Sequence, residues 1–225
     1  MRQAAAFFTP EDGKRIEEAV KEAESRTAAE FVPAVASASS HYDNAEDIIG
    51  LVAGAAASGL SWLAFDVLSL ELWGGAPWWS GALAGGLAAL LGFLAGAALG
   101  SAWPGLRLAF TTRRAKRAAV EARAKQVFEA CQVFSTTGGT GVLLYASMLE
   151  RMAAVVADRR VEDVFGPGGL DDIRSILEQG LKTGAACEFM RRAIAAAGAK
   201  LAGPFPRHDD DVNELPDTLV FVEEL

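Results

Sequence analysis

The sequence predicts an α/β fold, a small sheet flanked by helices, that is interrupted by a two-helix transmembrane hairpin. Two long apolar stretches follow one another in the first half of the chain. Helix and strand patterns occur on both sides of these stretches. The part before them holds too few apolar residues to fold alone, so it is expected to pack on the part that follows.

The composition sets the broad class of the protein. Of the 225 residues, 51% are hydrophobic and 22% are charged, which excludes intrinsic disorder. A formal net charge of -8 argues against a general nucleic-acid binder, whose affinity comes from Lys and Arg on phosphates. Cys131 and Cys187 are too few for a disulfide scaffold or a zinc site of four thiolates, so both are expected to be reduced core residues.

Two segments have the length and composition of membrane spans. No formal charge occurs from Ile48 to Phe65 or from Leu72 to Leu106. A bilayer core of about 30 Å needs roughly 20 helical residues, so each segment is long enough to cross it. The alternative is a pair of helices buried in a soluble core, but such helices usually keep a polar face. The short connection between the two segments predicts a hairpin.

The distribution of basic residues predicts the orientation of this hairpin. The connection between the spans has no Lys or Arg, whereas a basic segment follows the second span. The positive-inside rule then predicts a two-span protein of the cell inner membrane with both termini in the cytoplasm. No signal peptide is expected at the N-terminus. The basic residues nearest the second span are also candidates for contact with anionic lipid: Arg113, Arg114, Lys116 and Arg117.

Polar and small residues within the spans have two interpretations each. Asp66 is a candidate functional carboxylate, but its place near the end of the first span favours a solvated side chain. Glycines recur at four-residue spacing, as in Gly50 with Gly54 and Gly92 with Gly96. They are expected to pack the two spans against each other, and the alternative adds association between hairpins of two copies.

The parts outside the spans read as one interrupted domain. Thr9 is expected to cap a helix that runs to about Ser25, and a strand follows from Glu30, with Pro33 placing that strand at a sheet edge or a bulge. The second half predicts a helix over 112–133, strands over 141–149 and 152–158, and helices over 170–182 and 185–202. The predicted organisation is 1–47 for the first part of the domain, 48–106 for the hairpin, 107–203 for the second part and 204–225 for a polar tail.

Short motifs in the outer parts carry a resemblance to a known family. They are Phe8-Thr9 with Glu11-Asp12, Gly139–Val142, Ala157–Arg159 and Asn213–Asp217. In this order, around a hairpin, the chain resembles the TPM domain family, the thylakoid-lumen-phosphatase-like domain, in its bacterial membrane-anchored subset. The resemblance implies a small sheet flanked by helices. It also implies that calcium binding and acid phosphatase activity occur in some members and that others assist the assembly of membrane complexes.

The resemblance offers Asp158 as a metal ligand and calcium as the only candidate cofactor. The family's acidic loop usually reads Asp-x-Gly, whereas this chain has Asp158-Arg159-Arg160. A glycine allows close backbone approach to an ion, and Arg160 adds positive charge instead. No catalytic residue is predicted.

Other chemical motifs are weak. The two histidines, His41 and His208, lie in no catalytic motif. The glycine-rich segment 135–141 joins a helix to a strand, the reverse of a phosphate loop, and is expected to be a turn. Residues 208–211 are expected to be a solvated acidic segment, with a cation site as the alternative.

The sequence therefore favours a non-enzymatic, membrane-anchored TPM-like domain that acts in binding or assembly. Its expected partners are the lipid bilayer and a membrane protein, or a second copy bound through the glycine-rich spans. The alternative is a metal-dependent acid phosphatase.

Overall fold

The computed structural model describes residues 4–40, 42–72, 77–208 and 211–222. The chain divides into two compact units. The first, here called the α/β unit, comprises Met1–Ser40 and Lys116–Leu225. The second, the hairpin unit, comprises His41–Ala115.

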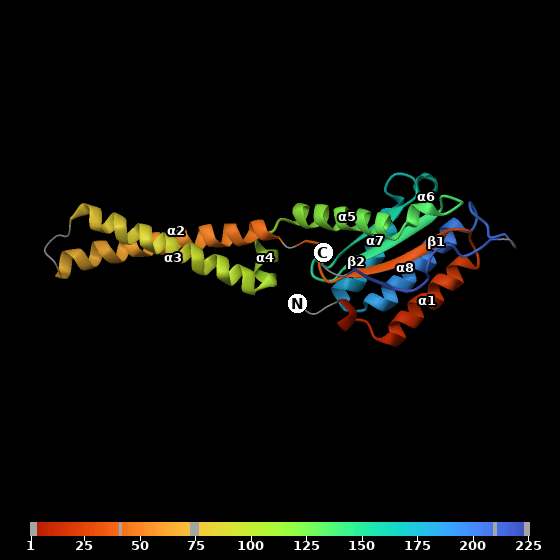
Figure 1. The fold of residues 1–225 in the computed structure, drawn as a ribbon, viewed down its shortest axis with the longest axis horizontal. Helices are drawn as coiled ribbons and strands as arrows, with labels where there is room; N and C mark the ends of the chain where they lie inside the picture. Colours follow the sequence, from red (N-terminus) through yellow and green to blue (C-terminus); the bar gives the residue numbers. More distant parts are fainter. Residues whose placement is uncertain (1–3, 41, 73–76, 209–210, 223–225) are drawn as a thin grey trace. The chain divides into compact units, whose positions relative to one another are not determined.

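A four-stranded sheet forms the centre of the α/β unit (Figure 1). Its strands are β1 (Glu30–Ala36), β2 (Gly141–Ser147), β3 (Met152–Ala157) and β4 (Val220–Val222), in the order β3-β2-β1-β4. β1 pairs in parallel with both β2 and β4, and β2 pairs antiparallel with β3. The mixed α/β fold predicted from the sequence is confirmed.

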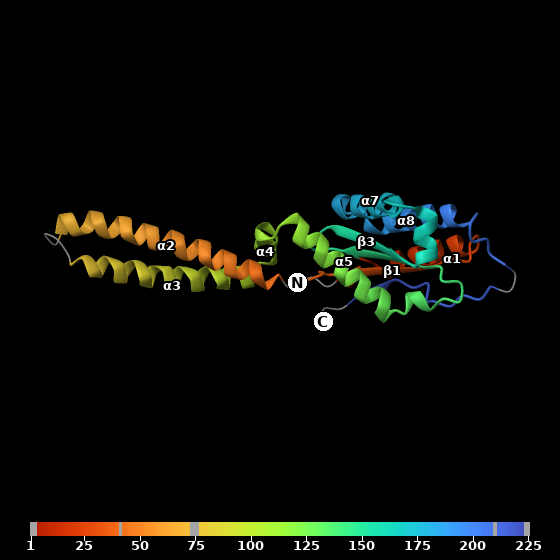
Figure 2. The same cartoon turned by 90° about the horizontal axis from the view of Figure 1, so that it is seen from above.

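Helices cover both faces of this sheet (Figure 2). Side chains alternate along a strand, so Phe31 and Val35 of β1 lie in one core cluster while Val32 and Ala34 lie in the other. The first cluster is covered by α1 (Pro10–Glu24), α6 (Arg159–Phe165), α7 (Gly169–Thr183) and α8 (Ala186–Leu201). The second is covered by α5 (Arg113–Ala130). Two short 3₁₀ turns, Ala4–Ala6 and Val133–Ser135, complete the described elements of this unit.

The start of α1 follows the prediction closely. Thr9 Oγ1 accepts a hydrogen bond from the Asp12 amide at 3.1 Å, and Asp12 Oδ2 accepts one from the Thr9 amide at 2.9 Å. Pro10 occupies the first helical position, where its missing N–H costs nothing. This reciprocal pair fixes where the helix begins, beside the cavity described below.

Three features of the α/β unit differ from the sequence analysis. β1 is an interior strand, not an edge strand, but β4 pairs with it only over Ala34–Ala36. Pro33 therefore lies one residue before that pairing, where its missing N–H leaves no ladder partner unsatisfied. The segment 204–225, expected to be a polar tail, packs on the unit through Leu219, which is buried, and β4. Helix α6 was not expected.

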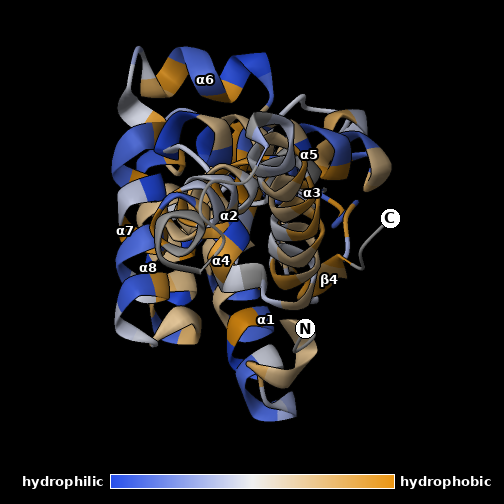
Figure 3. Cartoon of the chain, turned by 90° about the vertical axis from the view of Figure 1, so that its left-hand side faces the viewer, coloured by the Kyte–Doolittle hydropathy of each residue, from blue (hydrophilic) through white to orange (hydrophobic). Residues whose placement is uncertain are grey.

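The hairpin unit consists of α2 (Asp43–Leu72), α3 (Trp78–Ala102) and α4 (Pro104–Phe110). Ala45–Val67 and Trp79–Ala102 are long and apolar enough to cross a membrane, and only 17% and 11% of these windows are buried. Figure 3 colours α3 mostly in the tan and orange of apolar residues. Helices of a soluble core are usually mostly buried, and these two windows are mostly exposed.

The repeated glycines lie where α2 and α3 touch. A Cβ atom on Gly96 would come within 2.6 Å of the Ala53 Cβ, and one on Gly92 within 2.7 Å of the Ala57 Cβ. A Cβ on Gly54 would lie 2.7 Å from the Ala89 carbonyl oxygen. The glycines thus allow the two backbones to approach each other within one hairpin, as expected for small residues between membrane helices.

An ion pair connects α2 with α4. The Arg107 guanidinium lies 2.7 Å from Glu46 Oε1, and both side chains are less than one-quarter exposed. Ser101 donates a hydrogen bond to Glu46 Oε2 at 2.7 Å, and Arg107 Nε donates one to the Gly100 carbonyl at 2.9 Å. The four residues fasten the beginning of α2 to the end of α3.

Candidate functional site

The α/β unit contains a cavity of about 460 Å³. Four segments meet around it: the beginning of α1, the β2–β3 turn, the end of α7 and the beginning of α8. This volume falls within the range of small-molecule sites. Here it is called the arginine cavity, after the lining residues Arg15, Arg151 and Arg191.

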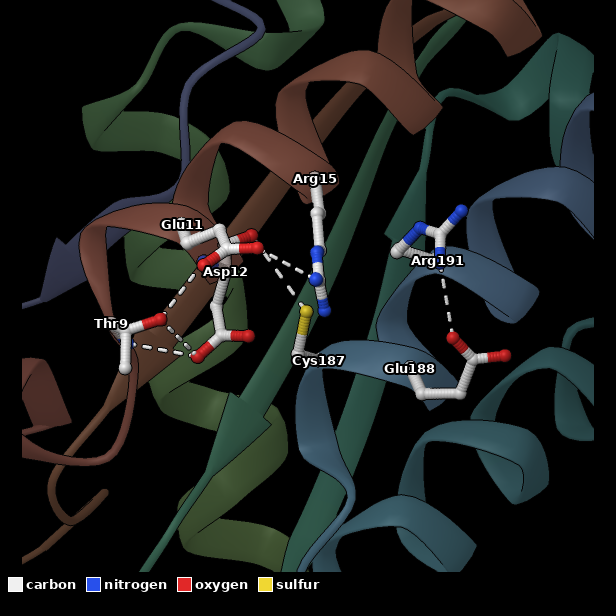
Figure 4. Close-up of polar contacts among 7 residues, drawn as sticks. All are labelled: Thr9, Glu11, Asp12, Arg15, Cys187, Glu188 and Arg191. Carbon is white, nitrogen blue, oxygen red and sulfur yellow. Dashed lines mark hydrogen bonds and ion pairs between the residues drawn. The ribbon is translucent and has the colours of Figure 1, made fainter.

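Helix α1 contributes Asp12 and Arg15 to the arginine cavity (Figure 4). Hydrogen bonds from the Thr9 amide and hydroxyl hold the pKa of the Asp12 carboxyl below its usual range. Arg15 Nη2 lies 2.7 Å from Glu11 Oε1, one helical turn earlier. Asp12 is thus an ionised group already tied to the cap of α1, and Arg15 is partly neutralised by Glu11.

The first turn of α8 forms another wall. Gly184 ends α7 in the left-handed conformation, with φ of 78°, and so lets the chain reverse into α8. The residue before α8 is Ala185, which has no side-chain acceptor for the first amides of that helix. The cavity is lined at this point by Ala185, Ala186 and Cys187. An uncapped positive end of a helix dipole therefore lies at the cavity.

Cys187 is chemically quiet in this setting. Burial, together with the neighbouring Asp12 carboxylate, raises the pKa of the Cys187 thiol to about 11. The Cys187 Sγ also donates a weak hydrogen bond to the Asp12 backbone carbonyl at 3.7 Å. Burial also raises the pKa of Cys131. Because the thiolate is the nucleophilic form, neither residue is arranged for nucleophilic catalysis.

Arg151 and Arg191 have unused donors. Arg151, in the β2–β3 turn, is exposed and has no carboxylate within ion-pair distance in the described part of the chain. Arg191 Nη1 lies 3.1 Å from Glu188 Oε2, while its buried Nε has no hydrogen-bond acceptor among the described residues. Three guanidinium groups against the two carboxylates Asp12 and Glu188 give the lining a net positive charge, on a chain of net charge -8.

Asp158 lies away from this cavity, between β3 and α6. Its Oδ2 accepts a hydrogen bond from the Gly141 amide at 2.9 Å, and its own amide donates to the Gly141 carbonyl at 2.9 Å. Among the residues that the structure describes, no group of three or more His, Cys, Asp or Glu side chains is arranged to hold a metal. Calcium at Asp158 stays a prediction, and the observed bonds join the start of β2 to the end of β3.

The basic residues after the second span have different environments. Arg117 lies 2.7 Å from Glu178 of α7 and donates to the Ala153 carbonyl of β3 at 3.2 Å, so it crosses the outer edge of the sheet. Arg113 and Arg114 are exposed and Lys116 is half-buried. Lipid contact by these residues stays a prediction, and Arg117 has a structural partner.

The remaining candidates are accounted for as follows. The glycine-rich segment is a turn before β2, with Gly139 at φ of 59° and the Thr140 amide donating to Thr136 Oγ1 at 3.0 Å. Asp66 and His208 are exposed. His41, Asp209 and Asp210 lie outside the described residues.

A buried acidic cluster was missed by the sequence analysis. Glu24 is 4% exposed, Glu30 is 8% exposed and Asp217 of the C-terminal segment is 9% exposed, and the charge of Asp217 acts on both glutamates. Burial, reinforced by the negative charges of Glu30 and Asp217, raises the pKa of Glu24 to about 8. The four-residue spacing of Ile16, Val20 and Glu24 places all three on one stripe of α1, and this was the available signal.

Comparison with known proteins identifies the fold only. No family model and no curated protein matches the chain. Among solved structures, it is similar to the NMR structure of BA42 from the psychrophilic bacterium Bizionia argentinensis, with a TM-score of 0.57 and 19% identity. The match covers 97% of this chain and 96% of that chain. The chain therefore shares the fold of a bacterial protein, BA42.

Proposed function

We propose that this protein is a membrane-anchored TPM-like domain that acts in binding or assembly with membrane partners. The observation that carries the proposal is the apolar surface of the hairpin unit. Leu60, Leu63, Leu87 and Leu91 are each about 60% exposed or more. Such a continuous apolar surface is unstable in water and suits the hydrocarbon core of a bilayer.

The sheet supports a hairpin with both ends on one side of the membrane. β1 precedes the hairpin and β2 follows it, yet the two strands pair directly along seven residues, from Glu30 with Gly141 to Ala36 with Ser147. An even number of spans satisfies this pairing. The basic residues that follow α3 favour the cytoplasmic side of the inner membrane for the α/β unit.

Cysteine labelling tests this orientation. An impermeant maleimide added to intact cells should label Gly75→Cys, between the two spans, and should leave Glu129→Cys of α5 unlabelled. Glu129 is exposed, so its cysteine should react once the cells are permeabilised. Labelling of Glu129→Cys in intact cells would overturn the orientation, and release of the protein from membranes by alkaline wash would overturn the anchor.

Photo-crosslinking tests the partner. A photoreactive residue at Leu91, which is 65% exposed on α3, should give a discrete adduct with a membrane protein or a second copy. The matched control is Phe93, whose aromatic side chain already lies against Gly50 of α2 within the same hairpin, so a photoreactive residue there should give only an internal link. Adducts with lipid alone at Leu91 would leave the bilayer as the hairpin's only partner and would contradict an assembly role.

A further inference from the structure

We infer that the arginine cavity binds a small organic anion through a phosphate or carboxylate group. The inference goes beyond the proposed function, because it concerns a ligand of the α/β unit and requires neither a bilayer nor a protein partner. All the residues that line the cavity belong to the α/β unit.

The guanidinium groups carry the argument. Arg151 from the β2–β3 turn, Arg191 from α8 and Arg15 from α1 come from three separate elements and converge on one cavity. Planar guanidinium groups bind phosphate and carboxylate oxygens through paired hydrogen bonds. Arg151 has no ion-pair partner in the described part of the chain, and the buried Nε of Arg191 lacks an acceptor there. A bound anion would pair with the Arg151 guanidinium and accept a hydrogen bond from the Arg191 Nε.

The carboxylates in the lining already have partners. Asp12 accepts hydrogen bonds from the amide and the hydroxyl of Thr9. Glu188 lies 3.1 Å from Arg191 and 3.0 Å from Arg192. The Thr9 bonds orient the Asp12 carboxylate without neutralising it, so the lining holds three positive and two negative charges. The excess positive charge is that of Arg151, which has no ion-pair partner in the described part of the chain and makes the cavity attractive to an anion. The uncapped N-terminus of α8 adds to this attraction.

The rest of the lining indicates an organic body on the ligand. Phe7, Met148 and Leu181 line the same cavity, and Phe7 is 50% exposed. A volume of about 460 Å³ exceeds what an inorganic phosphate fills. A small molecule with one anionic head and an apolar body matches both parts of the lining.

Calorimetric titration of the full chain in detergent micelles tests the inference. The probes are phenyl phosphate, benzoate and the neutral benzyl alcohol, at low ionic strength so that charge is not screened. Phenyl phosphate or benzoate should bind, benzyl alcohol should bind far more weakly, and the tighter anion identifies the head group. Absence of binding by both anions would overturn the inference.

Variants at two left-handed positions separate binding from folding. Arg151 and Gln132 have φ of 51° and 53°, a conformation that glycine adopts without strain. Arg151→Gly should fold at least as stably as the native chain but bind the anion at least about tenfold more weakly. Gln132→Gly, outside the cavity, should gain stability and keep full affinity. Equal affinity in the two variants would contradict a role for Arg151.

The native cysteines locate the ligand. Cys187 lines the cavity and Cys131 does not, and both are half-buried. Saturating phenyl phosphate should slow alkylation of Cys187 and leave the rate at Cys131 unchanged. Slowing at both residues, or at neither, would place the anion elsewhere and overturn the assignment. Arg191→Gln should abolish the protection of Cys187 even if Arg151→Gly retains part of it.

Discussion

Glu24 shows how one buried side chain links pH to stability. The pKa of the Glu24 carboxyl is raised from an ordinary value of 4.5 to about 8, so the folded protein holds this proton more tightly than the unfolded chain does. Stability from this group is fully present below about pH 4.5 and is lost as pH rises through about 8. Glu24 Oε1 meanwhile accepts the Phe31 amide at 2.9 Å, so the residue also joins α1 to β1.

Replacing Glu24 by glutamine should remove this pH dependence. The amide oxygen can still accept the Phe31 N–H, and no charge is buried at high pH. We expect the melting temperature of the native chain to fall between pH 5 and about 8, and that of Glu24→Gln to fall much less. Differential scanning calorimetry across this pH range measures the melting temperatures, and Glu17→Gln on the same helix is the control. Parallel pH profiles for native and Glu24→Gln chains would contradict the shifted pKa.

Asp158 is expected to act on stability. Asp158→Ala leaves the Gly141 amide without its acceptor, and the loss should be about 1–3 kcal/mol. Asp158→Asn keeps an acceptor oxygen and should cost less. Chemical denaturation measures both variants. A calcium-dependent rise in stability or phosphatase turnover that disappears in Asp158→Asn would instead favour the metal-dependent enzyme.

At the scale of the elements, the hairpin depends on glycines at the contact between α2 and α3. Gly96→Val would place side-chain atoms against Ala53, whereas a Cβ on Gly86 meets nothing within 4 Å. We expect Gly96→Val to destabilise the hairpin and Gly86→Val to leave it unchanged. All five tryptophans of the chain lie between Trp62 and Trp103, so thermal unfolding followed by tryptophan fluorescence in micelles reports on this unit. Equal transitions in the two variants would contradict the packing.

Local signals in the sequence predict the elements that depend on local interactions. Thr9 and Asp12 mark the start of α1, and short continuous apolar runs mark β2 and β3. The short β4 depends instead on pairing with β1, which lies far earlier in the chain, and three residues carry no periodicity. The arginine cavity also depends on contacts between residues distant in sequence, since Arg15, Arg151 and Arg191 come together only in the tertiary fold. No local pattern could predict it.

At the scale of the molecule, the α/β unit contains its own two core clusters. Every residue of both clusters lies in Met1–Ser40 or Lys116–Leu225. We therefore expect a chain in which 41–115 is replaced by a flexible linker to be soluble and to unfold cooperatively in calorimetry. The matched control, the same linker with Phe31→Ala, should lose about 3–5 kcal/mol because it opens a cavity in the core. An insoluble or non-cooperative product would show that the unit needs the hairpin to fold.

The position of β1 in the sheet has a consequence during synthesis. Both neighbours of β1 follow the hairpin in the chain, so a ribosome must make residues 37–140 before β2 appears. At ordinary elongation rates this takes roughly 5–20 s. During that interval β1, which is buried in the folded protein, has no partner on either edge. Unpaired apolar strands of nascent chains readily associate with other strands. Pro33 has no backbone N–H to donate, and Glu30 carries a negative charge. Both residues therefore oppose pairing of β1 with strands of other chains before β2 and β4 are made.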